Sequence, residues 1–284
     1  MSTTPAGSTI AYLGPPGTFS EAAALAYGGK DVTLLPLPSI PAVVTAIETG
    51  AATVGVLPIE NVLEGSVTTT LDLLIHETDL QIAGETVVPI RHYLAAQSGI
   101  ALPQIEVLYA HPQSLGQCRR FVERCLPSAA TIASLSNSAA PKEALADARP
   151  AAAICTLRAA ELSGAAILTQ DIQDRSHNVT RFIALGRQDN GQTGDDKTSF
   201  CFGFREDRAG VLIEALQVLA QGQINMTKLE SRPSKDVLGQ YIFLVDINGH
   251  RRDEQIARAL EHIQGQTGFF KIFGSYPRYV LVEE

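Results

Sequence analysis

Short, largely apolar runs alternate along the first two thirds of the chain with stretches whose apolar residues recur every three or four positions. The runs are typical of buried strands, and the stretches are typical of amphipathic helices. We expect strands at residues 10–13, 32–35, 54–57, 107–110 and 152–154. We expect helices at residues 20–26, 40–48, 68–75, 114–124 and 138–148. Strands that alternate with helices predict parallel α/β sheets, either in one domain or in two lobes with a cleft between them.

The pattern changes after a polar stretch at residues 186–197, GRQDNGQTGDDK, which has no large apolar residue. Such composition is typical of a linker. Beyond it we expect strands at 199–205, 226–230, 240–247 and 269–274, with helices at 211–220 and around Leu260. The order β-α-β-β-α-β is the ferredoxin-like unit. We therefore divide the chain into residues 9–186, a linker at 187–196 and a second domain at 197–276.

Composition and charge narrow the class of protein. The chain has 284 residues, 45% of them hydrophobic and 18% charged, which is typical of a globular protein. Its formal net charge of −8 argues against a nucleic-acid partner. No run approaches the ~18 apolar residues of a membrane span, and the N-terminus has no secretory leader pattern. The expected protein is soluble and cytoplasmic, without a membrane partner.

The cysteines and histidines make a metal site or a disulfide framework unexpected. The four cysteines form no C-x-x-C pair, and the six histidines include no H-E-x-x-H and no pair four residues apart. We expect no metal.

The first candidate site is the segment GPPGTFSE at residues 14–21, between an expected strand and an expected helix. Glycines let a backbone approach a ligand, and the free N–H groups at a helix start attract anions. Thr18 and Glu21 also have the spacing of a capping box, so a purely structural role as a helix cap is also open.

Three more polar clusters stand at the ends of expected strands, where ligands of α/β proteins bind. They are Glu60–Asn61 with Ser66 shortly after, the segment HPQSLGQ that ends at Gln117, and NVTRF at residues 178–182. In NVTRF an arginine fork can grip a carboxylate, and a threonine hydroxyl gives a directional hydrogen bond. Each cluster alone is also compatible with an ordinary turn.

Taken together, GPPGTFSE, PIEN with GSV, HPQSLGQC and NVTRF, followed by ESRP in the second domain, closely resemble the prephenate dehydratase family. The resemblance covers residues 9–186, and residues 197–276 resemble an ACT regulatory domain. It implies a bilobal α/β catalytic domain similar to periplasmic ligand-binding proteins, with the active site between the lobes. It also implies a lyase that converts prephenate to phenylpyruvate, CO2 and water in phenylalanine biosynthesis, with no cofactor.

The resemblance further assigns roles to individual residues. It implies catalytic roles for Thr180, Glu60 and Asn61. The implied substrate-binding residues are Gly17, Thr18, Phe19, Ser20, Ser66, Gln117, Ser138, Arg181 and Phe182. The implied phenylalanine-binding residues are Gly210, Val211, Leu212, Asn225, Glu230, Ser231, Arg232 and Pro233. The sequence departs from the family at Ala110, where many members have serine, and at Ala209 and Val211, where proline and alanine are commoner.

For the mechanism, we expect Arg181 and the backbone of residues 17–20 to hold the side-chain carboxylate of prephenate. Thr180 would hydrogen-bond the departing hydroxyl. Because threonine is a weak acid, Glu60 or water is the expected final proton source.

Feedback inhibition by phenylalanine through the second domain is expected, as is a homo-oligomer, either a dimer or a tetramer. Two alternatives stay open. One is an arogenate dehydratase, which no residue of the sequence distinguishes from a prephenate dehydratase. The other is a non-catalytic amino-acid-sensing protein, which the intact set of Thr180, Arg181, Glu60 and Asn61 disfavours.

Overall fold

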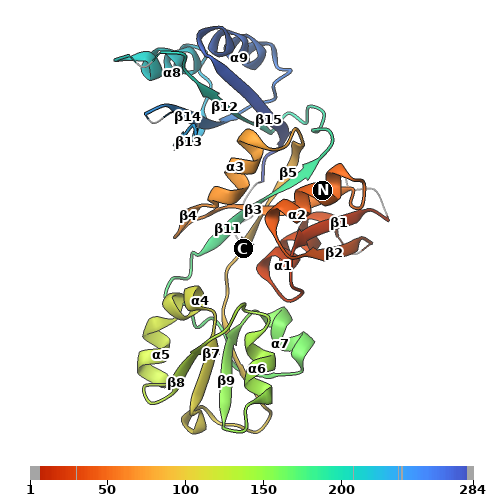
Figure 1. Ribbon diagram of the computed structural model, residues 1–284, viewed down its shortest axis with the longest axis vertical. Coiled ribbons are helices and arrows are strands. Elements are labelled where there is room, and N and C mark those ends of the chain that lie inside the picture. The colour runs from red at the N-terminus through yellow and green to blue at the C-terminus, as the bar shows by residue number, and fades with distance from the viewer. Residues whose placement is uncertain (1–6, 30, 207, 236, 238, 280–284) are drawn as a thin grey trace.

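The computed structural model describes residues 7–29, 31–206, 208–235, 237 and 239–279. These residues form three β-sheets with their helices, arranged one after another along the long axis of the molecule (Figure 1). Two lobes come from the first part of the chain, and the third unit is the C-terminal domain. Lobe one lies in the middle, between lobe two and the C-terminal domain (Figure 1).

Lobe one is built on a sheet of strand order β2-β1-β3-β11-β5. Its strands are β1 (Thr9–Leu13), β2 (Thr33–Leu37), β3 (Val54–Asn61), β4 (Gly65–Ser66), β5 (Gln81–Pro89) and β11 (Val179–Gly186). Its helices are α1 (Phe19–Gly28), α2 (Ile40–Glu48) and α3 (Thr68–His76). Strands β1, β2 and β3 are parallel, whereas β11 is antiparallel to both β3 and β5. The expectation of a wholly parallel sheet is therefore wrong here, because β11 returns from lobe two in the opposite direction. It is wrong for lobe two as well, where the strands at Tyr93–Ala96 and Ala151–Cys155 are antiparallel.

Lobe two has the strand order β10-β6-β9-β7-β8. Its strands are β6 (Tyr93–Ala96), β7 (Val107–Ala110), β8 (Ala130–Ala133), β9 (Ala151–Cys155) and β10 (Ala166–Thr169). Its helices are the 3₁₀ turn η1 (Leu102–Gln104), α4 (Pro112–Gln117), α5 (Arg119–Cys125), α6 (Ala140–Ala146) and α7 (Leu157–Ser163). The single helix expected at 114–124 is in fact two, because Cys118 leaves the helical conformation at φ −114°, ψ 17°.

Two segments cross between the lobes, residues 90–92 from β5 to β6 and residues 170–178 from β10 to β11. They are hydrogen-bonded to each other. The Ile90 N–H donates to the Asn178 carbonyl at 2.8 Å, and the Ile172 N–H donates to the His92 carbonyl at 3.1 Å. The expectation of two lobes, left open by periodicity, is confirmed.

The C-terminal domain has the expected β-α-β-β-α-β order. Its elements are β12 (Asp196–Gly203), α8 (Val211–Gln221), β13 (Met226–Pro233), β14 (Tyr241–Asn248), α9 (Glu254–Gln266) and β15 (Phe269–Pro277). The antiparallel sheet has the order β13-β14-β12-β15. Both helices cover one face through a core that includes Phe200, Leu219 and Ile263.

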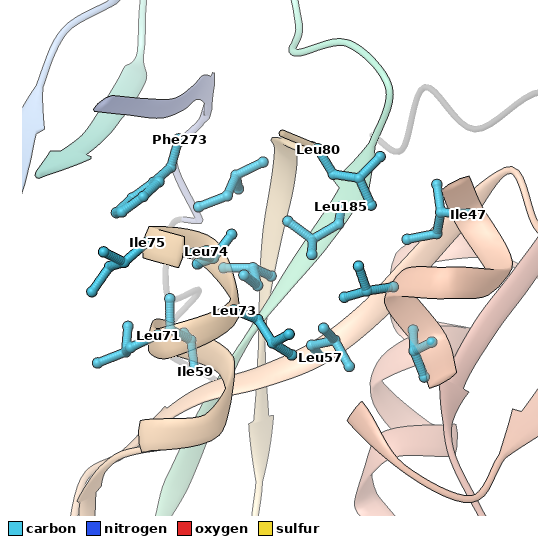
Figure 2. Packing of buried hydrophobic residues seen from close by; sticks show 14 of the residues in the cluster. Ile47, Leu57, Ile59, Leu71, Leu73, Leu74, Ile75, Leu80, Leu185 and Phe273 are labelled. Carbon is cyan, nitrogen blue, oxygen red and sulfur yellow. The ribbon is translucent and has the colours of Figure 1, made fainter. Parts of the chain in front are cut away.

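The other face of this sheet packs on lobe one. Phe273 and Leu244 share one buried cluster with Leu71, Leu74 and Ile82 of lobe one. Figure 2 shows Phe273 reaching toward α3, beside Leu74 and Ile75. The C-terminal domain and lobe one therefore have a common hydrophobic core. Within the described part of the chain, no helix has the length and apolarity needed to cross a membrane.

Candidate active site

The register between β11 and β3 determines which side chains meet at the cleft. Phe182 lies opposite Pro58, but one step further along β11, Arg181 lies opposite Glu60 and Thr180 lies opposite Asn61. Ile59 is the extra residue, as in a β-bulge. Regular pairing would have placed Glu60 opposite Thr180. Because paired residues point to the same face of a sheet, Thr180 and Asn61 share one face, and Arg181 and Glu60 share the other.

Thr180 and Asn61 are directly hydrogen-bonded. The Asn61 Nδ2 donates to the Thr180 Oγ1 at 2.9 Å and to the Asn178 Oδ1 at 2.8 Å. The Asn61 Oδ1 accepts from the backbone N–H groups of Leu63 and Glu64, which fixes the orientation of the amide. Because the Thr180 oxygen accepts from Asn61, its own hydroxyl proton is directed to another acceptor.

Gln117 of lobe two extends this network across the cleft. Its Oε1 accepts from the Asn178 Nδ2 at 3.1 Å and lies 2.9 Å from the His92 Nε2. Its Nε2 donates to the Glu64 Oε1 at 3.0 Å. The network therefore joins β3 and β11 of lobe one to α4 of lobe two.

Gln117 and Asn178 open onto a pocket of about 250 Å³, whose wall also includes Arg119, Arg120 and Arg175. Asp174 also lines this pocket, and Arg119 is paired with Glu123 at 2.7 Å. Arginines still outnumber the carboxylate in the lining, and guanidinium groups beside neutral amides suit an acidic ligand of small-molecule size. A larger cleft of about 910 Å³ runs between α1, β5 and α7, and Thr18 and Phe19 are among its lining residues.

Arg181 and Glu60 do not face this network. The Arg181 guanidinium donates to Glu85 at 2.6 Å, to Asp246 at 2.7 Å and to the Tyr276 hydroxyl at 2.9 Å. Glu60 lies 3.7 Å from Arg181 and 3.2 Å from Lys228. The expected substrate-binding role of Arg181 and the expected proton-donor role of Glu60 do not fit this geometry, because both side chains point toward the C-terminal domain.

The loop before α1 is held by internal hydrogen bonds. Thr18 caps α1 by accepting from the Glu21 N–H at 3.4 Å, and the Glu21 carboxylate accepts from the Gly17 N–H. Of the two interpretations of this segment, the structure therefore contains the capping interaction, and the Gly17 N–H already has a carboxylate partner. Ser20 is buried in the first turn of α1.

The same loop also contacts lobe two. The Thr156 hydroxyl donates to the Gly17 carbonyl at 2.6 Å. A β-carbon at Gly17 would lie 3.1 Å from the Cα of Ala159 and 3.1 Å from the Cβ of Ser138, so the approach of the lobes is close here. Ser138 thus lies against the loop, as expected for residues that border the cleft.

Three other expected site residues have different surroundings. Phe19 lies edge-on to the His92 ring, with the centroids 5.7 Å apart. Phe182 is 2% exposed within the core under α1, so a contact with substrate does not fit its position. Ser66 donates to Glu230 and accepts from Lys228 at 2.9 Å, which places it at the C-terminal domain rather than in the cleft.

The residues expected to bind phenylalanine fall into two groups. Gly210, Val211 and Leu212 line a pocket of about 330 Å³ that also includes Tyr241. The ESRP residues lie on β13 instead, where Arg232 forms an ion pair with Asp72 of α3 at 2.9 Å. Of the remaining expected residues, Asn225, Ser231 and Pro233 are exposed, and Glu230 bonds Ser66. The pairing of β13 with β14 brings part of the second group to the first, because Ser231 lies opposite Phe243 and Pro233 lies opposite Tyr241, and both of these partners line the pocket.

Sequence reasoning missed His92, Asn178 and Glu64 as members of the network. Asn178 lies two residues before Thr180, and the alternation of side chains along a strand indicates that the two share a face. His92 and Glu64 belong to no motif, and only the packing of the lobes brings them to Gln117. No group of three or more His, Cys, Asp or Glu among the described residues has a metal-binding arrangement.

These features define a two-lobed α/β protein with a polar cleft between its lobes and a ferredoxin-like domain packed on one of them. Family models for prephenate dehydratase and for the ACT domain match residues 10–190 and 204–263. The chain therefore belongs to the prephenate dehydratase family, and the resemblance seen in its motifs is confirmed.

Relatives and solved structures agree with this membership. The chain is 41% identical over 274 residues to the bifunctional chorismate mutase/prephenate dehydratase of Aquifex aeolicus, covering 96% of this chain and 75% of the relative. It is 34% identical to the prephenate dehydratase of Mycobacteroides abscessus, covering 95% and 90% of the two chains.

Among solved structures, it is similar to prephenate dehydratase from Arthrobacter aurescens in complex with L-Phe, with a TM-score of 0.87, 36% identity and 95% and 90% coverage. It is also similar to GqqA, described as a novel type of quorum-quenching acylase, with a TM-score of 0.85, 28% identity and 95% and 98% coverage.

Proposed function

We propose that this chain is a prephenate dehydratase, a carbon–oxygen lyase that produces phenylpyruvate, CO2 and water. Prephenate carries two carboxylates and a ring hydroxyl. When the ring carboxylate leaves as CO2, the electron pair of the broken C–C bond completes the aromatic ring, and the C–O bond breaks with its pair on oxygen. The leaving hydroxide then takes a proton and becomes water. The driving force is already in the substrate, so the enzyme needs mainly to hold it and to assist the departing oxygen.

The observation that carries this proposal is the hydrogen bond from Asn61 to the Thr180 oxygen. It leaves the hydroxyl proton of Thr180 free to donate to the departing oxygen. Threonine is too weak an acid to supply the proton alone, and Glu60 points to the other face of the sheet. Water in the cleft is therefore the proposed final proton source. The positive wall of Arg119, Arg120 and Arg175 is the proposed attraction for the carboxylates.

Phenylalanine is the proposed feedback inhibitor, as the motifs of the ACT domain indicate. The polar contacts that link that domain to the catalytic part include the pair Arg232–Asp72 and the cluster in which Arg181 meets Asp246. Arg181 directly follows Thr180 on β11, so a shift of the ACT sheet can alter the position of the catalytic hydroxyl. A homo-oligomer, commonly a tetramer in the family, and a cytoplasmic location complete the proposal.

The test is the release of phenylpyruvate from prephenate by the purified protein, with arogenate assayed in parallel and phenylalanine titrated into both. Thr180→Val, which keeps the shape and removes the hydroxyl, should lose at least about tenfold in kcat. Thr180→Ser should keep most of the activity. Thr78→Val is the matched control, because it also removes a buried threonine hydroxyl, one that donates to Glu48 at 2.6 Å. Near-normal turnover by Thr180→Val would refute the assignment, and turnover of arogenate alone would change the substrate.

A further inference from the structure

His92 lies at the crossing of the two segments that connect the lobes. Its side chain is buried, with 1% exposure. Its backbone N–H donates to the Gln173 Oε1 at 2.9 Å, its carbonyl accepts from Ile172, and its ring packs edge-on against Phe19. These contacts fix the ring between the two lobes.

The hydrogen bonds of the network establish which ring nitrogen of His92 carries a proton. The Gln117 Oε1 can only accept, and its assignment as oxygen follows from the donor Asn178 Nδ2 on one side and the acceptor Glu64 on the other. The His92 Nε2 must therefore donate to it. Burial lowers the pKa of His92, and the hydrogen bond to Gln117 acts in the opposite direction without cancelling this effect. The ring is consequently neutral near pH 7, with its proton on Nε2.

The other ring nitrogen has no role in holding the ring. The Nδ1 atom is buried and has no hydrogen-bond partner in the described part of the chain. A purely structural histidine would normally satisfy both nitrogens, since an unmade buried hydrogen bond costs about 1–3 kcal/mol. The arrangement keeps the Nε2–H directed at Gln117 in spite of that cost.

We propose that His92 is a positioning residue for the dehydration, and that it acts through Gln117. Its Nε2–H fixes the Gln117 carbonyl as the acceptor for Asn178. The amide of Asn178 then presents its oxygen to Asn61, and Asn61 presents its N–H to the Thr180 oxygen. In this network His92 and Asn178 both donate to the Gln117 oxygen. Asn61 donates to both Asn178 and Thr180, so the Thr180 oxygen is an acceptor and its proton is left for the departing oxygen. This inference rests on the proposed function.

The first experiment compares kcat and KM for prephenate in the wild type, His92→Phe and His92→Gln. His92→Phe keeps an aromatic ring against Phe19 and removes the donor, so kcat should fall by about 10- to 100-fold, as small misplacements of reacting groups do. KM should change by less than about threefold, because Thr180 acts on the departing oxygen in the transition state. His92→Gln can place an amide N–H near the position of Nε2 and should recover most of the lost activity.

A double variant tests whether the effect passes through Gln117. Gln117→Leu and His92→Phe/Gln117→Leu should have the same kcat, because once Gln117 is removed His92 has no side chain to position. If the fold-losses in kcat of the two single variants multiplied in the double variant, the inference would be overturned. A His92→Phe enzyme with wild-type kcat would also overturn it, and so would a His92→Gln enzyme that is no more active than His92→Phe. An inactive wild type would instead overturn the proposed function.

The tautomer can be measured without any variant. In a ¹⁵N-histidine NMR spectrum of the wild-type protein at neutral pH, His92 should show a protonated Nε2 and an unprotonated Nδ1. A proton on Nδ1 alone would overturn the inference, since Nε2 could not then donate to Gln117. This measurement keeps the proposal testable even if His92→Phe fails to fold.

Discussion

Asp246→Asn tests how strongly the ACT domain is attached to the catalytic part. Asp246 is 7% exposed, accepts from Arg181 at 2.7 Å and accepts from the Ser199 hydroxyl at 2.5 Å. Removing one member of a buried ion pair costs about 3–5 kcal/mol when the other charge is left alone. Here Glu85 still pairs with Arg181, and the asparagine oxygen can still accept one hydrogen bond. We therefore expect a loss of about 2–3 kcal/mol, slightly below that range.

Urea unfolding at pH 7 measures this loss. With a slope of about 3 kcal/mol/M, the midpoint should fall by about 1 M. Asp195→Asn is the matched control, because it removes the same charge from an exposed pair with Arg278, whose nearest atoms are 2.9 Å apart. An exposed pair contributes about 0–1 kcal/mol, so the control should change the midpoint little. Equal midpoints for the two variants would refute the reasoning.

The pH dependence gives a second check on the same substitution. Burial alone would raise the pKa of Asp246, but Arg181, the Ser199 hydroxyl and Lys197 outweigh it and leave the pKa below its usual range. A carboxyl group with a lowered pKa in the folded state contributes stability above its unfolded value of about 3.9, and this contribution is lost in acid. The gap in stability between wild type and Asp246→Asn should be constant from pH 8 to pH 5 and shrink below about pH 4. A gap that widened in acid would contradict this assignment.

Three further predictions concern other parts of the molecule. Phe182→Ala should lower the free energy of unfolding by about 3–5 kcal/mol, because it leaves a cavity under α1; a urea midpoint near that of the wild type would contradict its place in the core. Gly17→Ala should lower the melting temperature and raise KM for prephenate, because Gly17 has φ +90° and its new β-carbon would press on Ala159 and Ser138; unchanged values of both would contradict a close contact there. Ser231→Ala should weaken inhibition by phenylalanine, and inhibition curves that match those of the wild type would remove Ser231 from the effector site.

Much of the fold follows from local patterns. The alternation of strands and helices predicted the α/β class but left one domain or two lobes open, and only the family resemblance implied two lobes. The β-α-β-β-α-β order of the C-terminal domain was predicted directly because its apolar stripes are regular. At the site, residue types at the ends of strands made Asn61 and Thr180 candidates, and the family resemblance gave them their expected catalytic roles. Local sequence is sufficient to predict a side chain's position where its direction follows directly from the regular repeat of the helix or strand that carries it.

The rest depends on contacts between distant segments. Ile59 shifts the register by one residue, so Glu60 faces the ACT domain although the plain alternation of β3 places it beside Thr180. Arg181 looked like a carboxylate ligand because its partners Glu85 and Asp246 come from another strand and another domain. No pattern within β3 or β11 encodes either outcome.

The common core of lobe one and the ACT domain has a consequence for how such a chain can be divided. A truncated chain that ended before β12 would open the α3 side of lobe one, where Leu71 and Leu74 now pack against Leu244 and Phe273. An apolar surface of that kind favours aggregation. An ACT domain of another specificity could therefore replace this one only if its sheet carried the same apolar face toward lobe one. A cut at the linker alone would divide one hydrophobic core into two exposed parts.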